Sequence, residues 1–141
     1  MKGGYLLDTH ILIWLLDDDN CLNEDIREDI DYFQDAYYIS VETLREIVIL
    51  QSLKKISFTP GVDKIIIDLQ KRQIGILPVE AIHIRELEKL PTLSINGKKH
   101  EDPFDRLLIS QAIAGKYTII SSDSKFPFYE DYGLKLLVNE L

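Results

Sequence analysis

The chain has 141 residues, of which 45% are hydrophobic and 28% are charged. This composition predicts one folded domain over residues 1–141 and excludes a disordered or collagen-like chain. The formal net charge of −8 at pH 7 argues against nonspecific binding of nucleic acid through a broad basic face.

The compartment is predicted from the cysteine count and the apolar runs. Cys21 is the only cysteine, which excludes an intrachain disulfide and favours a reducing compartment. The longest apolar run, Ile11 to Leu16, is too short to cross a bilayer. Asp8 interrupts the apolar stretch near the N-terminus, so no signal peptide is expected. We therefore expect a soluble cytoplasmic protein.

The first predicted unit is a strand, a turn and a helix. Residues Gly4 to Leu7 form the strand, and the helix runs from His10 to Leu16 with Thr9 as its N-cap. Asp8 then lies at the carboxyl end of the strand, where parallel α/β sheets bind ligands. A turn-forming or capping role is the competing interpretation of this aspartate.

The second unit repeats this order. A helix over 23–35 with Asn23 as its cap is followed by a strand over 36–39, and Ser40 caps a helix over 41–52. Glu46 has apolar neighbours on that helix, so its carboxylate needs a partner.

Two alternatives stay open at this helix. Glu42, one turn earlier, is the competing carboxylate. An ion pair between Glu46 and Arg45 or another base is the structural interpretation. We prefer Glu46 because its flanks are apolar.

In the middle of the chain the sequence predicts two helices, an edge strand and a loop. A helix begins at Thr59-Pro60-Gly61 and runs through Gln73, with Gly75 as the residue that can end it. An edge strand covers 76–79, and a second helix covers 81–90 with Ile84 and Leu87 facing inward. The loop over 92–101 contains an Asn-Gly turn and three bases that either meet phosphate or are simply solvated. These bases are Lys98, Lys99 and His100.

The next helix begins at Asp102, which fits the N-cap position directly before Pro103. Asp105 heads the apolar stripe of this helix, and an ionised carboxylate there is expensive unless a cation or several donors meet it. Capping and chemistry explain Asp105 equally well until other carboxylates converge on it. The remaining residues of the stripe are Leu108, Ile109 and Ala112.

The last predicted units place a further acid after a strand. A strand over 117–120 leads to Ser121, Ser122 and Asp123, and a short helix and a final strand follow between 126 and 138. Alternating strands and helices predict a three-layer α/β/α domain with a central parallel sheet. The carboxyl ends of its strands share one edge, so four acids can approach one crevice. They are Asp8, Glu46, Asp105 and Asp123.

Four motifs carry a resemblance to a known family. The stretches LLDTHILIWLL, LREIVIL, HEDPFDRLLISQA and SSDSKF resemble the successive motifs of PIN-domain nucleases, and most closely those of VapC-like toxins of toxin–antitoxin operons. The most specific part is DPFDRLL, which lies within the third stretch. By this likeness the four acids above correspond to the family's acidic residues, and Asp102 to a supporting aspartate. Arg45, Leu50 and Ser110 depart from residues common in this subgroup, which bears on partner or substrate choice more than on metal binding.

The resemblance implies a metal-dependent endoribonuclease. Clustered carboxylates repel one another unless cations enter, and oxygen-rich sites suit one or two Mg²⁺ or Mn²⁺ ions. Such ions support hydrolysis of RNA to a 3′-hydroxyl and a 5′-phosphate. The residues expected to position a ligand or water are Thr9, Ser121 and Ser122. The weaker candidates for phosphate contact are Arg106, Lys98, Lys99 and His100.

The resemblance also implies partners, namely a cognate antitoxin and a second copy of the chain. Two other functions compete with the nuclease. One is a noncatalytic PIN-like module that binds RNA or protein. The other is an aspartate phosphotransfer domain, which the spacing disfavours because His10 stands where a phosphatase needs a second aspartate.

Overall fold

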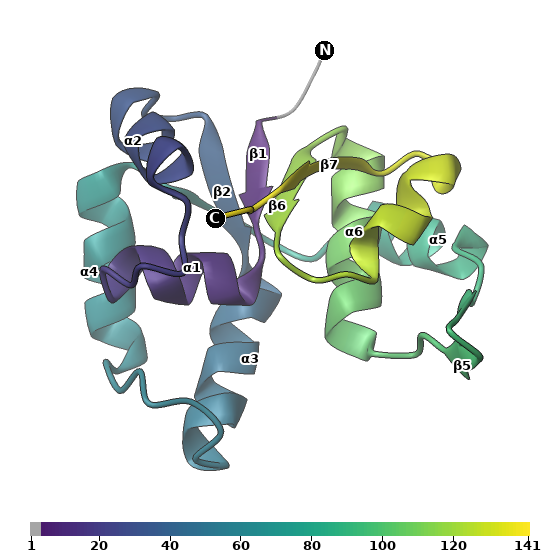
Figure 1. Cartoon of the computed structure of the whole chain (residues 1–141), viewed down its shortest axis with the longest axis horizontal. Coiled ribbons are helices and arrows are strands. Elements are labelled where there is room, and N and C mark those ends of the chain that lie inside the picture. Colours follow the sequence, from purple (N-terminus) through teal and green to yellow (C-terminus); the bar gives the residue numbers. More distant parts are fainter. Residues whose placement is uncertain (1–3) are drawn as a thin grey trace.

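The computed structural model describes residues 4–141 and contains a five-stranded parallel sheet with the strand order β3-β2-β1-β6-β7 (Figure 1). Its strands are β1 (Tyr5–Leu7), β2 (Tyr37–Ser40), β3 (Gly75–Leu77), β6 (Thr118–Ser121) and β7 (Lys135–Val138). Helices cover both faces of the sheet, so the predicted three-layer α/β/α architecture is confirmed.

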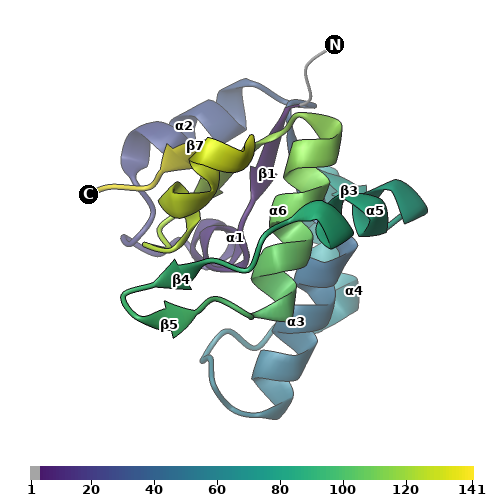
Figure 2. The ribbon, with the colours of Figure 1, turned by 90° about the vertical axis from the view of Figure 1, so that its right-hand side faces the viewer.

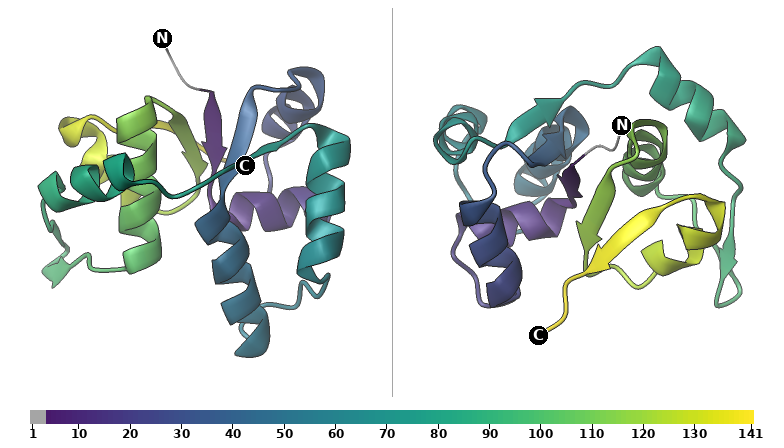
Figure 3. Two further views of the ribbon diagram at one scale, coloured as in Figure 1. Left: turned by 180° about the vertical axis from the view of Figure 1, so that it is seen from behind. Right: turned by 90° about the horizontal axis from the view of Figure 1, so that it is seen from above.

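Seven helices and a small hairpin surround this sheet in residues 4–141. The helices are α1 (Thr9–Leu16), α2 (Glu24–Tyr32), α3 (Val41–Ser52), α4 (Val62–Arg72), α5 (Ala81–Lys89), α6 (Pro103–Gly115) and the 3-10 helix η1 (Phe126–Tyr132). The hairpin pairs β4 (Ser94–Ile95) with β5 (Lys98–Lys99) and projects beside the start of α6 (Figure 2). Seen from above, α1 to α4 lie on one side of the sheet, and α5, α6 and η1 lie on the other (Figure 3).

The core has two parts because successive side chains of a strand point to opposite faces. Leu7 packs with apolar residues of α1 to α4, whereas Leu6 packs with those of α6 and η1. On α6 the predicted apolar stripe is buried, with Leu108, Ile109 and Ala112 all nearly inaccessible to solvent. The stripe therefore anchors α6 against the sheet and fixes the position of its first turn.

Most predicted helix starts are confirmed, with one correction that bears on the site. Asn23, Ser40 and Asp102 cap α2, α3 and α6 through their side chains, as predicted. The cap of α1, however, is Asp8 and not Thr9, because the Asp8 side chain accepts from the Thr9 N–H.

Helix α4 ends one residue before the predicted end at Gln73. The helix ends at Arg72, and Gln73 takes the left-handed conformation with φ of 56°. Gly75 belongs instead to β3, where a Cβ atom would lie 2.7 Å from the ring of Tyr38. A close approach to an aromatic ring, and not a helix end, therefore explains this glycine.

The segment over 81–101 differs from the prediction at α5. Ile84 does not face the core, since it is 50% exposed, and the buried residue of α5 is His83, whose Nδ1 accepts from the Glu80 N–H at 2.9 Å. Asn96 and Gly97 do form the predicted turn, both with positive φ, and this turn closes the β4–β5 hairpin.

No helix within residues 4–141 is long and apolar enough to span a membrane.

Candidate functional site

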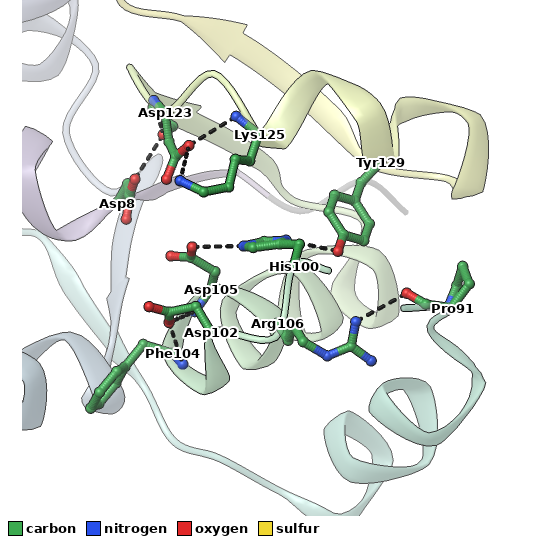
Figure 4. A network of polar contacts seen from close by, with 11 residues as sticks. Asp8, Pro91, His100, Asp102, Phe104, Asp105, Arg106, Asp123, Lys125 and Tyr129 are labelled. Carbon is green, nitrogen blue, oxygen red and sulfur yellow. Dashed lines mark hydrogen bonds and ion pairs between the residues drawn. The ribbon is translucent and has the colours of Figure 1, made fainter. Parts of the chain in front are cut away.

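The carboxyl ends of β1 and β6 and the first turn of α6 enclose a crevice of about 350 Å³. All four predicted acids line it, so residues distant along the chain meet at the edge where parallel sheets bind ligands. Figure 4 shows three of them together with the contacts around α6. The residues that line the crevice are Asp8, Thr9, His10, Trp14, Glu46, Asp102, Asp105, Ser122, Asp123 and Lys125.

Asp8 is held at the edge of the sheet by two hydrogen bonds. The Thr9 N–H donates to Asp8 Oδ1 at 2.7 Å, and the Ser121 hydroxyl donates to Oδ2 at 2.7 Å. Burial raises the pKa of Asp8. The hydrogen bonds from Ser121 and Thr9 lower this pKa in part, and the nearby charge of Asp123 raises it again. The two hydrogen bonds therefore orient the Asp8 carboxylate, but they do not fully offset the effect of burial on its pKa.

Ser121 links the ends of the two strands. While its hydroxyl donates to Asp8, its oxygen accepts from the Asp123 N–H at 3.0 Å. Asp123 in turn lies beside Lys125, whose backbone N–H and Nζ are 2.8 and 3.3 Å from Asp123 Oδ1. This lysine partly neutralises the fourth acid.

Glu46 reaches the crevice from α3. The Thr9 hydroxyl donates to Glu46 Oε1 at 2.5 Å, and Thr9 is buried. Burial raises the pKa of Glu46. The hydrogen bond from Thr9 lowers this pKa in part, and the charge of Asp8 raises it again. Glu42 instead forms an ion pair with Arg45 at 3.0 Å, so the geometry favours Glu46 over its competitor on the same helix.

Asp105 has a strongly raised pKa. Its side chain is 18% exposed, and Oδ2 lies 2.9 Å from Nε2 of His100. Burial, and then the charges of neighbouring acids, raise the pKa of Asp105 to about 8. Those acids, in order of decreasing influence, are Asp102, Asp8, Asp123 and Glu46. At neutral pH the crevice therefore holds a proton that a cation could displace.

The donor set fits a hard divalent cation. Its groups are carboxylate oxygens, the ligand type of Mg²⁺ and Mn²⁺, and three of the four have a pKa raised first by burial and then by the charges of neighbouring acids. Within residues 4–141, no three His, Cys, Asp or Glu side chains are already grouped closely enough to hold a metal ion. The acids thus share a crevice without forming a closed cage, as expected of carboxylates that repel one another.

Asp102 supports the site through the backbone. Its Oδ1 accepts from the N–H groups of Phe104 and Asp105 at 2.9 and 3.0 Å. Asp102→Ala is expected to destabilise the protein by about 1 kcal/mol in urea unfolding, because both N–H groups lose their acceptor. Asp102→Ser keeps the cap and should stay within a few tenths of a kcal/mol of the wild type. Equal stability of the Ala and Ser variants would show that the cap contributes nothing.

The bases predicted for phosphate contact separate into two groups. Lys98 and Lys99 are exposed on β5 and line a second hollow of about 400 Å³ beside the crevice, together with Lys125. His100 is buried, and the Arg106 guanidinium donates to the Pro91 and Leu90 carbonyls at 3.0 Å. The geometry therefore favours internal roles for His100 and Arg106 and leaves the two lysines accessible.

Sequence reasoning missed two residues near the site, Asn139 and Tyr129. Ser122, predicted to position a ligand, donates to the Asn139 carbonyl at 3.3 Å, and the Asn139 amide donates back to its hydroxyl at 2.9 Å. The Asn139 amide also donates to the Cys21 carbonyl, and this hydrogen bond connects the end of the chain to the loop after α1. Tyr129, which is fully buried, contacts His100. No local pattern in the sequence marks Asn139 or Tyr129.

The comparisons with known proteins identify a family and a fold. A family model described as PIN domain matches residues 5–130. A solved structure of VapBC2 from Rickettsia felis, bound to a DNA fragment from their promoter, aligns with 17% identity and a TM-score of 0.65 over 96% of this chain and 98% of that chain. DNA-bound VapBC from Salmonella typhimurium aligns with 13% identity and a TM-score of 0.67 over the same shares. Among curated proteins, none matches the sequence.

Proposed function

Because this chain belongs to the PIN-domain family, we propose that it is a metal-dependent endoribonuclease, formed as one nuclease domain over residues 1–141 and acting in the cytoplasm. The single observation that carries the proposal is the convergence of four acids from four separate segments on one crevice. Structural acids are normally paired one by one, whereas three of these have a pKa raised by burial and by mutual repulsion.

The residues proposed to hold one or two Mg²⁺ or Mn²⁺ ions are Asp8, Glu46, Asp105 and Asp123. When bound, the metal would lower the pKa of an attacking water and stabilise the negative charge that develops on the phosphate. Ser121 and Thr9 would keep the Asp8 and Glu46 carboxylates oriented through the hydrogen bonds that they donate. Hydrolysis adds water at phosphorus and breaks the bond to O3′, which leaves a 3′-hydroxyl and a 5′-phosphate.

The proposed substrate is RNA, either single-stranded or in a structured loop. The side chains of Lys98 and Lys99 project from β5 beside the crevice, where they can contact phosphates on either side of the cleaved bond. In a chain with a net charge of −8, such a local basic patch would act only near the site. Backbone contacts of this kind position a substrate without selecting its sequence.

We further propose that the protein is the toxin of a toxin–antitoxin pair. Support comes from the resemblance to VapC-like toxins and from the fold shared with the two VapBC complexes. A cognate antitoxin would then inhibit the enzyme by placing a side chain, such as an arginine, near the acids. A second copy of the chain is also proposed as a partner, because α3 exposes Val41 and Val48 beside an apolar hollow of about 410 Å³.

The test is cleavage of a labelled RNA by purified protein with Mn²⁺, with Mg²⁺, and after treatment with EDTA. We expect cleavage with either ion, products that carry a 5′-phosphate, and loss of activity with EDTA that added Mn²⁺ restores. Activity that survives EDTA would contradict the metal-dependent mechanism. Binding of RNA without cleavage under every metal condition would instead favour the noncatalytic module, and labelling of Asp8 by a phosphoryl donor would favour the phosphotransfer domain.

A further inference from the structure

A buried pair of side chains lies behind Asp105, on the side away from the other acids. The His100 ring stands between Asp105 and Tyr129, with Nε2 2.9 Å from Asp105 Oδ2 and Nδ1 2.8 Å from the Tyr129 hydroxyl (Figure 4). His100 is 4% exposed and Tyr129 is 0% exposed. Both ring nitrogens therefore have partners inside the protein, and the imidazole is held in one orientation.

The chemistry of the three groups sets the direction of these hydrogen bonds. When Asp105 binds a cation it is ionised and its carboxylate only accepts, so the nitrogen of His100 that faces Asp105 then carries a proton. In a neutral imidazole the other nitrogen is then an acceptor, and the Tyr129 hydroxyl can donate to it. Tyr129 thereby selects the tautomer that directs an N–H toward Asp105.

The backbone fixes both ends of this arrangement. The His100 N–H donates to the Leu93 carbonyl at 2.9 Å, and Asp102 caps the turn of α6 that carries Asp105. The Tyr129 ring meets the His100 ring edge-on, with centroids 5.5 Å apart and an interplanar angle of 62°. The contact thus joins three separate segments, which are the end of the hairpin, the start of α6 and η1.

We propose that His100 and Tyr129 are positioning residues, which hold Asp105 through Oδ2 and leave its other oxygen for a divalent cation. This inference rests on the proposed function, because that function makes Asp105 a metal ligand. Hydrogen-bond partners behind a metal ligand keep it in place for binding, and their loss typically costs about 10- to 100-fold in metal affinity or activity. The proposal also explains a buried polar pair that the proposed hydrolysis itself does not use.

Tyr129→Phe tests the proposal, because it removes the hydroxyl and keeps the ring that packs on His100. We expect calorimetry to show Mn²⁺ binding weakened by about tenfold or more. In the protein saturated with Mg²⁺, ¹⁵N spectra of the imidazole should show His100 moving from one tautomer to a mixture. Tyr132→Phe is the matched control, because Tyr132 lies on the same helix with 48% exposure, and it should change neither measurement.

A second pair of variants separates hydrogen bonding from packing. His100→Gln can keep an N–H near Asp105 and should retain more Mn²⁺ affinity than His100→Leu. Equal losses in these two variants, or unchanged affinity and tautomer in Tyr129→Phe while the wild type binds Mn²⁺, would overturn the positioning role alone. Absence of Mn²⁺ binding and RNA cleavage in the wild type would instead overturn the proposed function, and this inference with it.

Discussion

Asp8→Asn is expected to lower metal-dependent RNA cleavage by about two orders of magnitude or more while the protein stays folded. The amide oxygen can still accept from the Thr9 N–H, and the amide nitrogen can donate to the Ser121 oxygen. What the variant loses is one negative charge of the crevice, which is the charge that a divalent cation needs. Initial rates of RNA cleavage with Mn²⁺ measure the effect.

The stability of the same variant distinguishes a ligand from a structural acid. Burial and the charge of Asp123 raise the pKa of Asp8, so its ionised form is unfavourable in the folded metal-free protein. The melting temperature of Asp8→Asn without metal should therefore equal or exceed that of the wild type. Asp131→Asn, a change on the surface of η1, serves as the control and should affect neither activity nor melting. A folded Asp8→Asn protein with wild-type activity would contradict the assignment.

The metal-free protein is expected to lose stability as pH rises toward 8. The pKa of Asp105 lies at about 8 in the folded protein, against an ordinary value of 3.8, so the folded state retains a proton that the unfolded state has released. Stability is therefore fully present below pH 3.8 and decreases as pH rises through 8, with a slope of at most about 1.4 kcal/mol per pH unit for one proton.

The window from pH 6.5 to 8 reduces the opposing contribution of His100. Burial lowers the pKa of His100 from its ordinary value of 6.5, and this shift makes stability rise with pH at lower pH. Urea unfolding in EDTA at several pH values within the window should show the decrease in the wild type and a flatter dependence in Asp105→Asn. A stability that is constant in the wild type, or an equal slope in both proteins, would contradict the raised pKa of Asp105.

The acids of the crevice were predictable because each lies at a position that topology fixes. Asp8 follows a strand, Asp123 lies two residues after another strand, and Asp105 is in the first turn of a capped helix. A parallel sheet brings such positions to one edge whatever their separation along the chain. Glu46 was predicted on weaker grounds, its apolar flanks, and the structure supplies the actual contact, a hydrogen bond from Thr9.

The contacts behind the acids were not predictable, because they depend on side chains that meet only in the fold. The Lys98 to His100 run looks like one basic cluster in the sequence, yet His100 is buried whereas the two lysines are exposed. Its partner Tyr129 is 29 residues away and has no local signal. The prediction that Ile84 faces the core was wrong for a related reason, since the capping contact at Glu80 directs His83, and not Ile84, into the protein.

The most direct test of the metal site is the anomalous diffraction of a crystal soaked in Mn²⁺. We expect a peak in the crevice with oxygen ligands from Asp8 and at least one of Asp105, Asp123 and Glu46, at about 2 Å as is usual for small divalent cations. Strong Mn²⁺ peaks located only outside this crevice, or none at millimolar Mn²⁺, would contradict a nuclease built on these carboxylates.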